Sequence, residues 1–189
     1  MFRGLRWKSP AGRGDREVVD EYLRSRSNGS FRELYERHAG AMFALALRFL
    51  GGRSNDAEDA VQEAWLRALS SLPSFRWESS LRTWLCGITV NCCRERVREA
   101  WWPVAPPDPP ATVSDRSDRL QVEELLARLP PGYRAVLVLH DIEGYTHREI
   151  AQLFGIDEGT ARSQLSRARS TFKRWLSGST EEHVARRRQ

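Results

Sequence analysis

Arg, Ser and Gln side chains gather in the segment 162–169, at spacings that suit the reading of DNA. Arg forms paired hydrogen bonds with guanine edges and with phosphates, while Ser and Gln can bond base edges. Ala161, Leu165 and Ala168 recur among them at helical spacing. The pattern predicts a helix with an apolar inner face and a basic outer face that can enter a major groove. The predicted DNA contacts are Arg162, Ser163, Gln164, Ser166, Arg167 and Arg169.

The residues before this helix predict how it is positioned. Thr146 and Glu149 have the spacing of a capping box, which satisfies free amide donors where a helix begins. Gly155 suits the left-handed conformation that ends a helix, and Asp157 suits the N-cap of the next one. Residues 145–174 therefore predict a helix-turn-helix. The alternative is an ordinary helical hairpin with a solvated basic face.

A second group of side chains is acidic and lies near the middle of the chain. Acidic residues often gather in the first turn of a helix because of the helix dipole, which would explain Asp56, Glu58 and Asp59 but not Glu63. An acidic face on a basic protein suits a basic protein partner better than it suits DNA. We therefore favour a partner-binding surface, made of Asp56, Glu58, Asp59, Gln62 and Glu63.

A third group is the loop over residues 75–80, which mixes aromatic, cationic and hydroxyl side chains, with Asn91 and Arg94 on the helix that follows. A protein that opens a duplex can compensate by stacking an unpaired base and bonding its edge. Trp84 falls on the inner face of the following helix, so we expect it to pack in the core rather than to insert between DNA bases.

The elements that would carry these groups are all helical. Ser30 and Glu33 have capping-box spacing, as have Asn55 and Glu58. Five of the nine prolines lie between residues 103 and 110, where neither helix nor sheet can continue. No segment alternates as a strand would. The predicted helices cover 15–26, 31–50, 56–71, 80–101, 118–129, a stretch up to about 141 and the helix-turn-helix.

The fold prediction is thus all-α, with two small helical domains on a Pro-rich linker. The Pro-rich segment has the composition of a semi-rigid, extended tether. The predicted boundaries are a basic arm without regular structure over 1–14, a first domain over 15–101, the linker over 102–117, a second domain over 118–177 and a basic tail over 178–189.

Charge is unevenly distributed along the 189 residues. The formal net charge is +5, and residues 158–189 carry eight basic against three acidic side chains. Such a concentrated excess is typical of a nucleic-acid-binding segment. No run of 18 apolar residues exists, and the basic N-terminus lacks the apolar segment of a signal peptide. We expect a cytoplasmic protein without membrane contact.

Cysteine and histidine usage argues against a metal site, a cofactor or catalysis. Cys86, Cys92 and Cys93 form no C-x-x-C pair and are expected to be buried free thiols. The histidines are dispersed, and His38 and His140 are expected to be structural. Neither a P-loop nor a G-x-S-x-G motif occurs. The sequence therefore indicates a binding protein rather than an enzyme.

Most of the chain resembles the extracytoplasmic-function group of bacterial sigma factors. Region 2 of that family is similar to three successive segments, FRELYERHAGAMFALALRFLGG, DAEDAVQEAWLRAL and FRWESSLRTWLCGITVNCCRERVRE. LLARLPPGYRAVLVLHDIEGYTHREIAQLFGIDEGTARSQLSRAR is similar to region 4. The resemblance covers roughly 31–99 and 118–175, and it implies a dissociable specificity subunit that performs no catalysis.

The resemblance also implies partners. The acidic helix would bind core RNA polymerase at the clamp helices of its largest subunit, and region 4 would meet the flap. The 162–169 helix would read the −35 promoter element. The −10 element would be read as a single strand by Phe75, Arg76, Ser79, Ser80, Asn91 and Arg94. An anti-sigma protein is a further expected partner.

Two departures from the family's pattern affect the expected promoter. Gln164 and Ser166 stand where Arg and a His or aromatic residue are common, and Trp77 stands where a small residue is common.

Two other functions remain open from the residues alone. One is a helix-turn-helix repressor or activator that binds duplex DNA by itself, and the other is an enzyme acting on nucleic acid. A repressor has no need of the acidic helix or of the 75–80 loop.

Overall fold

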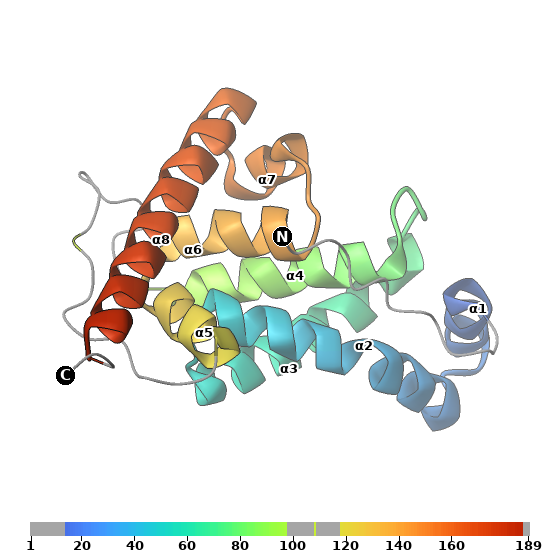
Figure 1. Ribbon diagram of the computed structural model, residues 1–189. Helices are drawn as coiled ribbons and strands as arrows, with labels where there is room; N and C mark the ends of the chain where they lie inside the picture. The colour runs from blue at the N-terminus through green and yellow to red at the C-terminus, as the bar shows by residue number, and fades with distance from the viewer. Residues whose placement is uncertain (1–13, 98–107, 109–117, 187–189) are drawn as a thin grey trace. The chain divides into compact units, whose positions relative to one another are not determined.

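The computed structural model describes residues 14–97, 108 and 118–186, and the side chains of the last helix up to residue 177 (Figure 1). Every regular element within those residues is helical, which confirms the all-α prediction. They form two compact units: 14–47 with 54–96, and 48–53 with 97, 108 and 118–186. The predictions for the arm up to residue 13, and for the linker apart from Asp108, lie outside the described residues.

The first unit is built from four helices and a short 3₁₀ turn. Two of the helices, α3 and α4, pack against each other along their length. Pro73 lies within η1 and ends α3, as the sequence predicts. The elements are α1 (Asp15–Ser25), α2 (Asn28–Phe49), α3 (Ser54–Ser71), η1 (Leu72–Ser74) and α4 (Leu81–Arg96).

Two predicted helix starts in this unit are wrong by two or three residues. Helix α2 begins at Asn28 because the Ser27 hydroxyl already accepts a hydrogen bond from the Ser30 amide, at 3.2 Å. Ser30 is therefore the third helical residue and not the cap. Helix α3 begins at Ser54, so Asn55 lies inside its first turn. The predicted end of α2 is confirmed, since Gly51 and Gly52 both have left-handed φ angles (68° and 82°).

The core of the first unit holds the cysteines and ties α1 to α2. Cys86, Cys92 and Cys93 are buried and free, as predicted, and burial raises the pKa of Cys93 to about 12. His38 is also buried, with Nε2 3.3 Å from Asp15 Oδ1. The close contact with His38, together with a hydrogen bond from Arg37, holds the pKa of Asp15 below its usual value. This contact fixes the beginning of α1 on α2.

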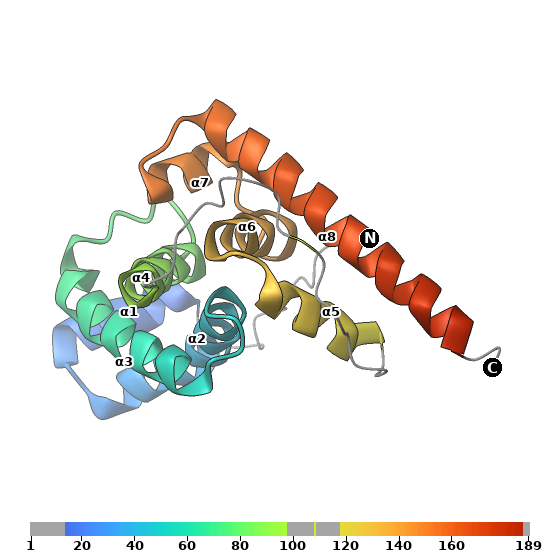
Figure 2. The same cartoon turned by 90° about the vertical axis from the view of Figure 1, so that its left-hand side faces the viewer.

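The second unit packs short helices against one long helix, α8. Its elements are α5 (Asp118–Arg128), α6 (Pro131–Leu137), a π-helical turn η2 (Val138–Ile142), α7 (His147–Phe154) and α8 (Glu158–Arg186). Helices α5, α6 and α7 all contact α8, and α7 lies beside its beginning (Figure 2). Pro131 occupies the first turn of α6, where a missing N–H costs nothing. The backbone of α8 stays helical to Arg186, well into the predicted tail.

Candidate nucleic-acid interface

The helix-turn-helix has the local geometry that its sequence predicts. Thr146 Oγ1 accepts a hydrogen bond from the Glu149 amide (3.2 Å), and the Thr146 amide donates to Glu149 Oε2 (2.8 Å), which completes the capping box. Gly155 ends α7 with φ of +65°. The Ala161 amide donates to the Asp157 carbonyl at 3.0 Å, so Asp157 stands at the N-cap position of α8. These contacts fix the angle at which α8 leaves the turn.

Helix α8 presents one buried and one open face. Ala161, Leu165 and Ala168 expose 1%, 1% and 0% of their surface, which confirms the predicted inner face. Five of the six predicted DNA contacts are exposed, namely Arg162, Ser163, Ser166, Arg167 and Arg169. The Arg162 guanidinium donates to Glu158 Oε1 at 3.1 Å, between two side chains that are both largely exposed. Such a pair is weak and can exchange for a phosphate or a base.

Two of the six, Gln164 and Arg169, have surroundings that the sequence did not predict. Gln164 is half-buried, and its Oε1 is buried with no hydrogen-bond partner within the described residues. Arg169 pairs with Asp141 of η2, with Nε 3.0 Å from Oδ2, and its Nη2 lies 3.2 Å from His140 Nδ1. Burial raises the pKa of Asp141, but hydrogen bonds from Arg169 and His140 outweigh it and lower the pKa overall. Arg169 thus also holds α8 to η2, a role that the sequence did not reveal.

The acidic group on α3 divides in a similar way. Glu58, Asp59 and Gln62 are exposed, and Asp56 is half-buried. Glu63 instead accepts a hydrogen bond from Arg67 Nε at 2.8 Å, the usual partner four residues along a helix.

Arg67 in turn holds a second carboxylate, on the neighbouring helix. Its two terminal nitrogens donate to both oxygens of Glu95 on α4, at 2.6 and 2.8 Å. The hydrogen bond from Arg67 lowers the pKa of Glu95. Glu63 therefore belongs to a network that links α3 to α4.

Leu66 extends the exposed face of α3 and was missed by the sequence analysis. It exposes 64% of its surface, the largest fraction among the exposed large apolar residues in the described part of the chain. It follows Gln62 by four residues and Asp59 by seven, so all three share one side of the helix. This helical spacing could have shown from the sequence that Leu66 lies beside the acidic residues. We define the α3 face as Glu58, Asp59, Gln62 and Leu66.

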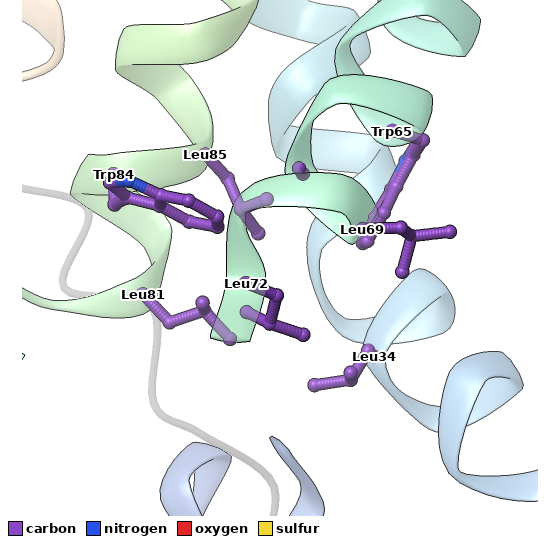
Figure 3. A pocket seen from close by; sticks show the side chains of 8 residues that line it. Leu34, Trp65, Leu69, Leu72, Leu81, Trp84 and Leu85 are labelled. Atoms are coloured by element: carbon purple, nitrogen blue, oxygen red, sulfur yellow. The ribbon is translucent and has the colours of Figure 1, made fainter. Parts of the chain in front are cut away.

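The 75–80 loop is organised around stacked aromatic rings. Phe75 stacks on Trp84 with ring centroids 4.8 Å apart and planes 30° apart. Trp84 is half-buried, and it lines a small apolar hollow with Leu81 and Leu85 of α4 (Figure 3). Leu34 on α2, with Trp65 and Leu69 on α3, closes the other side of that hollow (Figure 3). Trp84 is thus an inner-face residue, as expected, that also supports the loop.

The remaining side chains that were predicted to bind single-stranded DNA lie at two ends of α4. Arg76 and Ser79 are exposed in the loop, while Ser80 caps α4 by accepting a hydrogen bond from the Thr83 amide at 3.0 Å. Asn91 is exposed and Arg94 half-buried, both in the second half of α4. Ten residues of helix rise about 15 Å, so Asn91 does not meet the loop. The fold divides the set between the loop before α4 and the second half of α4 rather than gathering it in one pocket.

The described part of the chain offers neither a metal cluster nor a membrane-spanning helix. Within it, no group of three or more His, Cys, Asp or Glu side chains could hold a metal ion. None of its helices is both long and apolar enough to cross a membrane.

Sequence families account for both units. The family described as Sigma-70 region 2 matches residues 34–103, and the family described as Sigma-70, region 4 matches residues 119–172. An acidic helix and an aromatic loop in the first unit, followed by a capped helix-turn-helix in the second, are thus the arrangement of a sigma-70-type initiation factor.

Individual proteins narrow this class. The chain is 35% identical over 169 residues to the ECF RNA polymerase sigma factor SigM of Mycobacterium tuberculosis, covering 87% of this chain and 85% of the relative. It is 31% identical over 166 residues to the ECF RNA polymerase sigma factor SigE of Mycolicibacterium smegmatis, covering 81% and 64%.

Solved structures agree. CnrH, in complex with the cytosolic domain of CnrY, matches with a TM-score of 0.59 at 27% identity, over 87% of this chain and 97% of that chain. The sigma factor RpoE of Bartonella quintana, in complex with the anti-sigma factor NepR, matches with a TM-score of 0.58 at 25% identity, over 78% and 96%. The chain belongs to the extracytoplasmic-function RNA polymerase sigma factors.

The function follows from the family. The protein is a sigma factor that directs RNA polymerase to promoters, and not a repressor that acts alone. The resemblance to regions 2 and 4 noted in the sequence is confirmed.

Proposed function

We propose that three separate surfaces divide the work of initiation in this protein. The α3 face binds the clamp helices of the largest polymerase subunit. The aromatic loop, with Asn91 and Arg94, binds the −10 element as a single strand. The outer face of α8 reads the −35 element in the duplex. The observation that carries the proposal is the two-sided α8, whose apolar side is buried and whose Arg- and Ser-rich side is open on a capped helix-turn-helix.

The −35 proposal concentrates on the first three turns of α8. Arg162, Ser163, Ser166 and Arg167 are exposed there, next to the turn that aims the helix. Helices of this kind place their N-terminal residues against base edges in the major groove. Arg169 is held by Asp141, so we assign it to orienting α8 and to phosphate contact rather than to base reading. Gln164 can reach a base only if its half-buried side chain turns outward.

The polymerase proposal rests on the mixed chemistry of the α3 face. Glu58 and Asp59 supply negative charge, Gln62 supplies a polar contact, and Leu66 supplies exposed apolar area. Acidic groups beside an exposed apolar side chain suit a basic protein surface, because charge steers the encounter while apolar burial supplies affinity. Asp56 lies beside this face, and Glu63 contributes indirectly by fixing Arg67.

The −10 proposal rests on the loop's combination of rings and hydrogen-bonding groups. Phe75 offers an aromatic surface backed by Trp84, and Arg76 and Ser79 are open to a nucleotide. Ser80 would contribute mainly by beginning α4 at the right place. Asn91 and Arg94 would meet a different part of the strand. Stacking on such platforms can compensate for the loss of base pairing.

Further roles complete the proposal. Residues 15–101 and 118–177 would act as separate region 2 and region 4 domains on the 102–117 linker, with region 4 also meeting the polymerase flap. Because CnrH and RpoE were both solved with a protein partner, we propose a protein of the anti-sigma class as a regulator. The protein would act in the cytoplasm with core polymerase and would catalyse no reaction itself.

Run-off transcription tests the proposal directly. Purified core polymerase is assayed with and without the protein on genomic fragments that include the region upstream of its own gene. We expect transcripts that depend on the protein and yield a promoter with separate −35 and −10 elements. Absence of such transcripts, together with salt-sensitive binding of the protein alone to a palindromic duplex, would contradict it.

The three surfaces are then separated by substitution on that promoter. Asp59→Asn should weaken core binding, Arg162→Ala should affect −35 duplexes, and Arg76→Ala should affect templates with an unpaired −10 strand. Ser170→Ala, at an exposed position on α8 outside the proposed set, is the matched control. A variant whose defect falls in the wrong assay would contradict the assignment of its surface.

A further inference from the structure

A cation and three aromatic rings form a continuous row in the first unit. Trp84 stacks on Phe75, and Phe75 lies against Trp77 with ring centroids 4.8 Å apart and planes 51° apart. The guanidinium carbon of Arg16, on α1, lies 5.6 Å from the centre of the Trp77 ring. Neither Arg16 nor Trp77 belongs to the −10 set proposed above.

The backbone at Trp77 is held in an unfavourable conformation. Its φ is +58°, in the left-handed region that a bulky side chain rarely occupies. Strain of this kind persists only where surrounding contacts hold it, and it concentrates at functional sites. Here the ring contact with Phe75 and the cation above the ring are the contacts that hold Trp77 in place. The side chain is half-buried, so part of the ring stays open.

Arg16 is delivered to this position by a fixed backbone and not by a free tail. Its neighbour Asp15 is anchored to α2 through Arg37 (3.2 Å) and His38 (3.3 Å). Val18 and Val19 bury the same helix in the core. The Arg16 side chain itself is exposed, so its guanidinium can move while its attachment point cannot.

From this geometry we infer that Trp77 and Arg16 form a clamp that takes one unpaired promoter base between the indole ring and the guanidinium. Stacked bases are separated by about 3.4 Å, so a sandwiched base needs roughly 6.8 Å between the outer planes. The guanidinium carbon now lies 5.6 Å from the ring centre, so the exposed Arg16 side chain must swing outward to admit a base. Both groups are surfaces on which bases stack.

The nucleic-acid chemistry of the surroundings favours a base over a protein side chain as the occupant. Arg76 precedes Trp77 and is exposed, so it can neutralise the phosphate beside a bound base. Glu78 follows and is also exposed, and the two cations beside the ring are Arg16 of α1 and Arg76 of the loop. The clamp rests on the proposed −10 function and adds a base contact to it.

Binding of the holoenzyme to fork-junction DNA tests the clamp. The probe carries a duplex −35 element and an unpaired nontemplate −10 strand, and a fully paired duplex is the reference. We expect Trp77→Ala and Arg16→Ala each to weaken fork binding about tenfold, because stacking of a single base has that weight. The double variant should lose less than the product of the two single losses, since both residues hold the same base. Core binding and duplex binding should stay unchanged.

Matched variants and a modified probe sharpen the test. Trp77→Phe keeps a ring and should retain most of the binding, and Arg24→Ala removes an exposed charge from the other end of α1 and should have no effect. An abasic nucleotide is then moved along the unpaired strand. At one position it should weaken the wild type but not Trp77→Ala, which identifies the clamped base.

Each remaining outcome contradicts the clamp in a distinct way. Stronger fork binding by Arg16→Ala would make Arg16 a cover and not a partner of Trp77. A loss of core affinity in Trp77→Ala would assign the ring to a protein contact. Loss with Arg76→Ala but none with Trp77→Ala or Arg16→Ala would refute the clamp and leave the −10 surface standing. Equal binding of fork and duplex by the wild type would refute the −10 surface as well.

Discussion

Shortening Leu66 should separate partner binding from folding. The side chain exposes 64% of its surface, so the fold buries only about a third of it. Burying a whole leucine side chain is worth roughly 1.5–3 kcal/mol. If core polymerase covers the open part, Leu66→Ala forfeits about 1–2 kcal/mol of binding, which is about a 5- to 30-fold rise in Kd. The free energy of unfolding should change by less than about 1 kcal/mol.

The assay for Leu66 is titration of labelled protein with core polymerase, followed by anisotropy, with urea unfolding measured in parallel. Leu66→Met keeps the volume and apolar character and serves as the control, with a Kd close to that of the wild type. Asp59→Asn, on the same side of α3, should slow association and flatten its salt dependence. An unchanged Kd for Leu66→Ala, with unchanged stability, would remove the α3 face from the polymerase contact.

Three further predictions concern the second unit. Arg162→Ala should cost roughly 1–3 kcal/mol on the cognate −35 duplex and relax preference between cognate and scrambled sequences; unchanged discrimination in competition binding would refute base reading. Gly155→Ala should destabilise by about 1–2 kcal/mol in urea unfolding because φ is +65°, whereas Gly159→Ala inside α8 should not; equal effects would contradict the argument from conformation. Burial and the charge of His140 lower the pKa of His147 below 6.5, so its stabilising effect is present above pH 6.5 and lost as pH falls through the lowered pKa. The melting temperature should therefore drop between pH 7 and 5 and drop less in His147→Gln; identical acid sensitivity in the variant would argue against this role.

Local rules predicted the helix-turn-helix well because its signals lie a few residues apart. Thr146 and Glu149 form the capping box, and Gly155 adopts the expected left-handed conformation. Both features depend only on residues that are close together in the sequence. The same rules misplaced the start of α2, because Ser27 and Ser30 are both good capping residues. The choice between them follows from burial of Ser30, which is a tertiary property.

The contacts that the sequence could not reveal join residues far apart in the chain. Arg169 meets Asp141 and Arg67 meets Glu95 across 28 residues in each case, and no periodicity announces such pairs. They decide which members of a basic or acidic cluster stay available to a partner. The left-handed Trp77 was equally hidden, because propensity argues against that conformation for an aromatic residue.

The length of α4 has a consequence for the spacing of promoter contacts. On the proposed function, the loop before Leu81 and the Asn91–Arg94 side chains touch one DNA strand from two ends of a rigid rod. The rod separates them by about 15 Å, the span of four to five stacked nucleotides. The length of α4 would therefore fix this spacing. One added helical turn would lengthen the helix by about 5.4 Å, which is the length of between one and two stacked nucleotides. If the proposal holds, the number of residues in α4 would set the distance between the two contacted parts of the −10 strand.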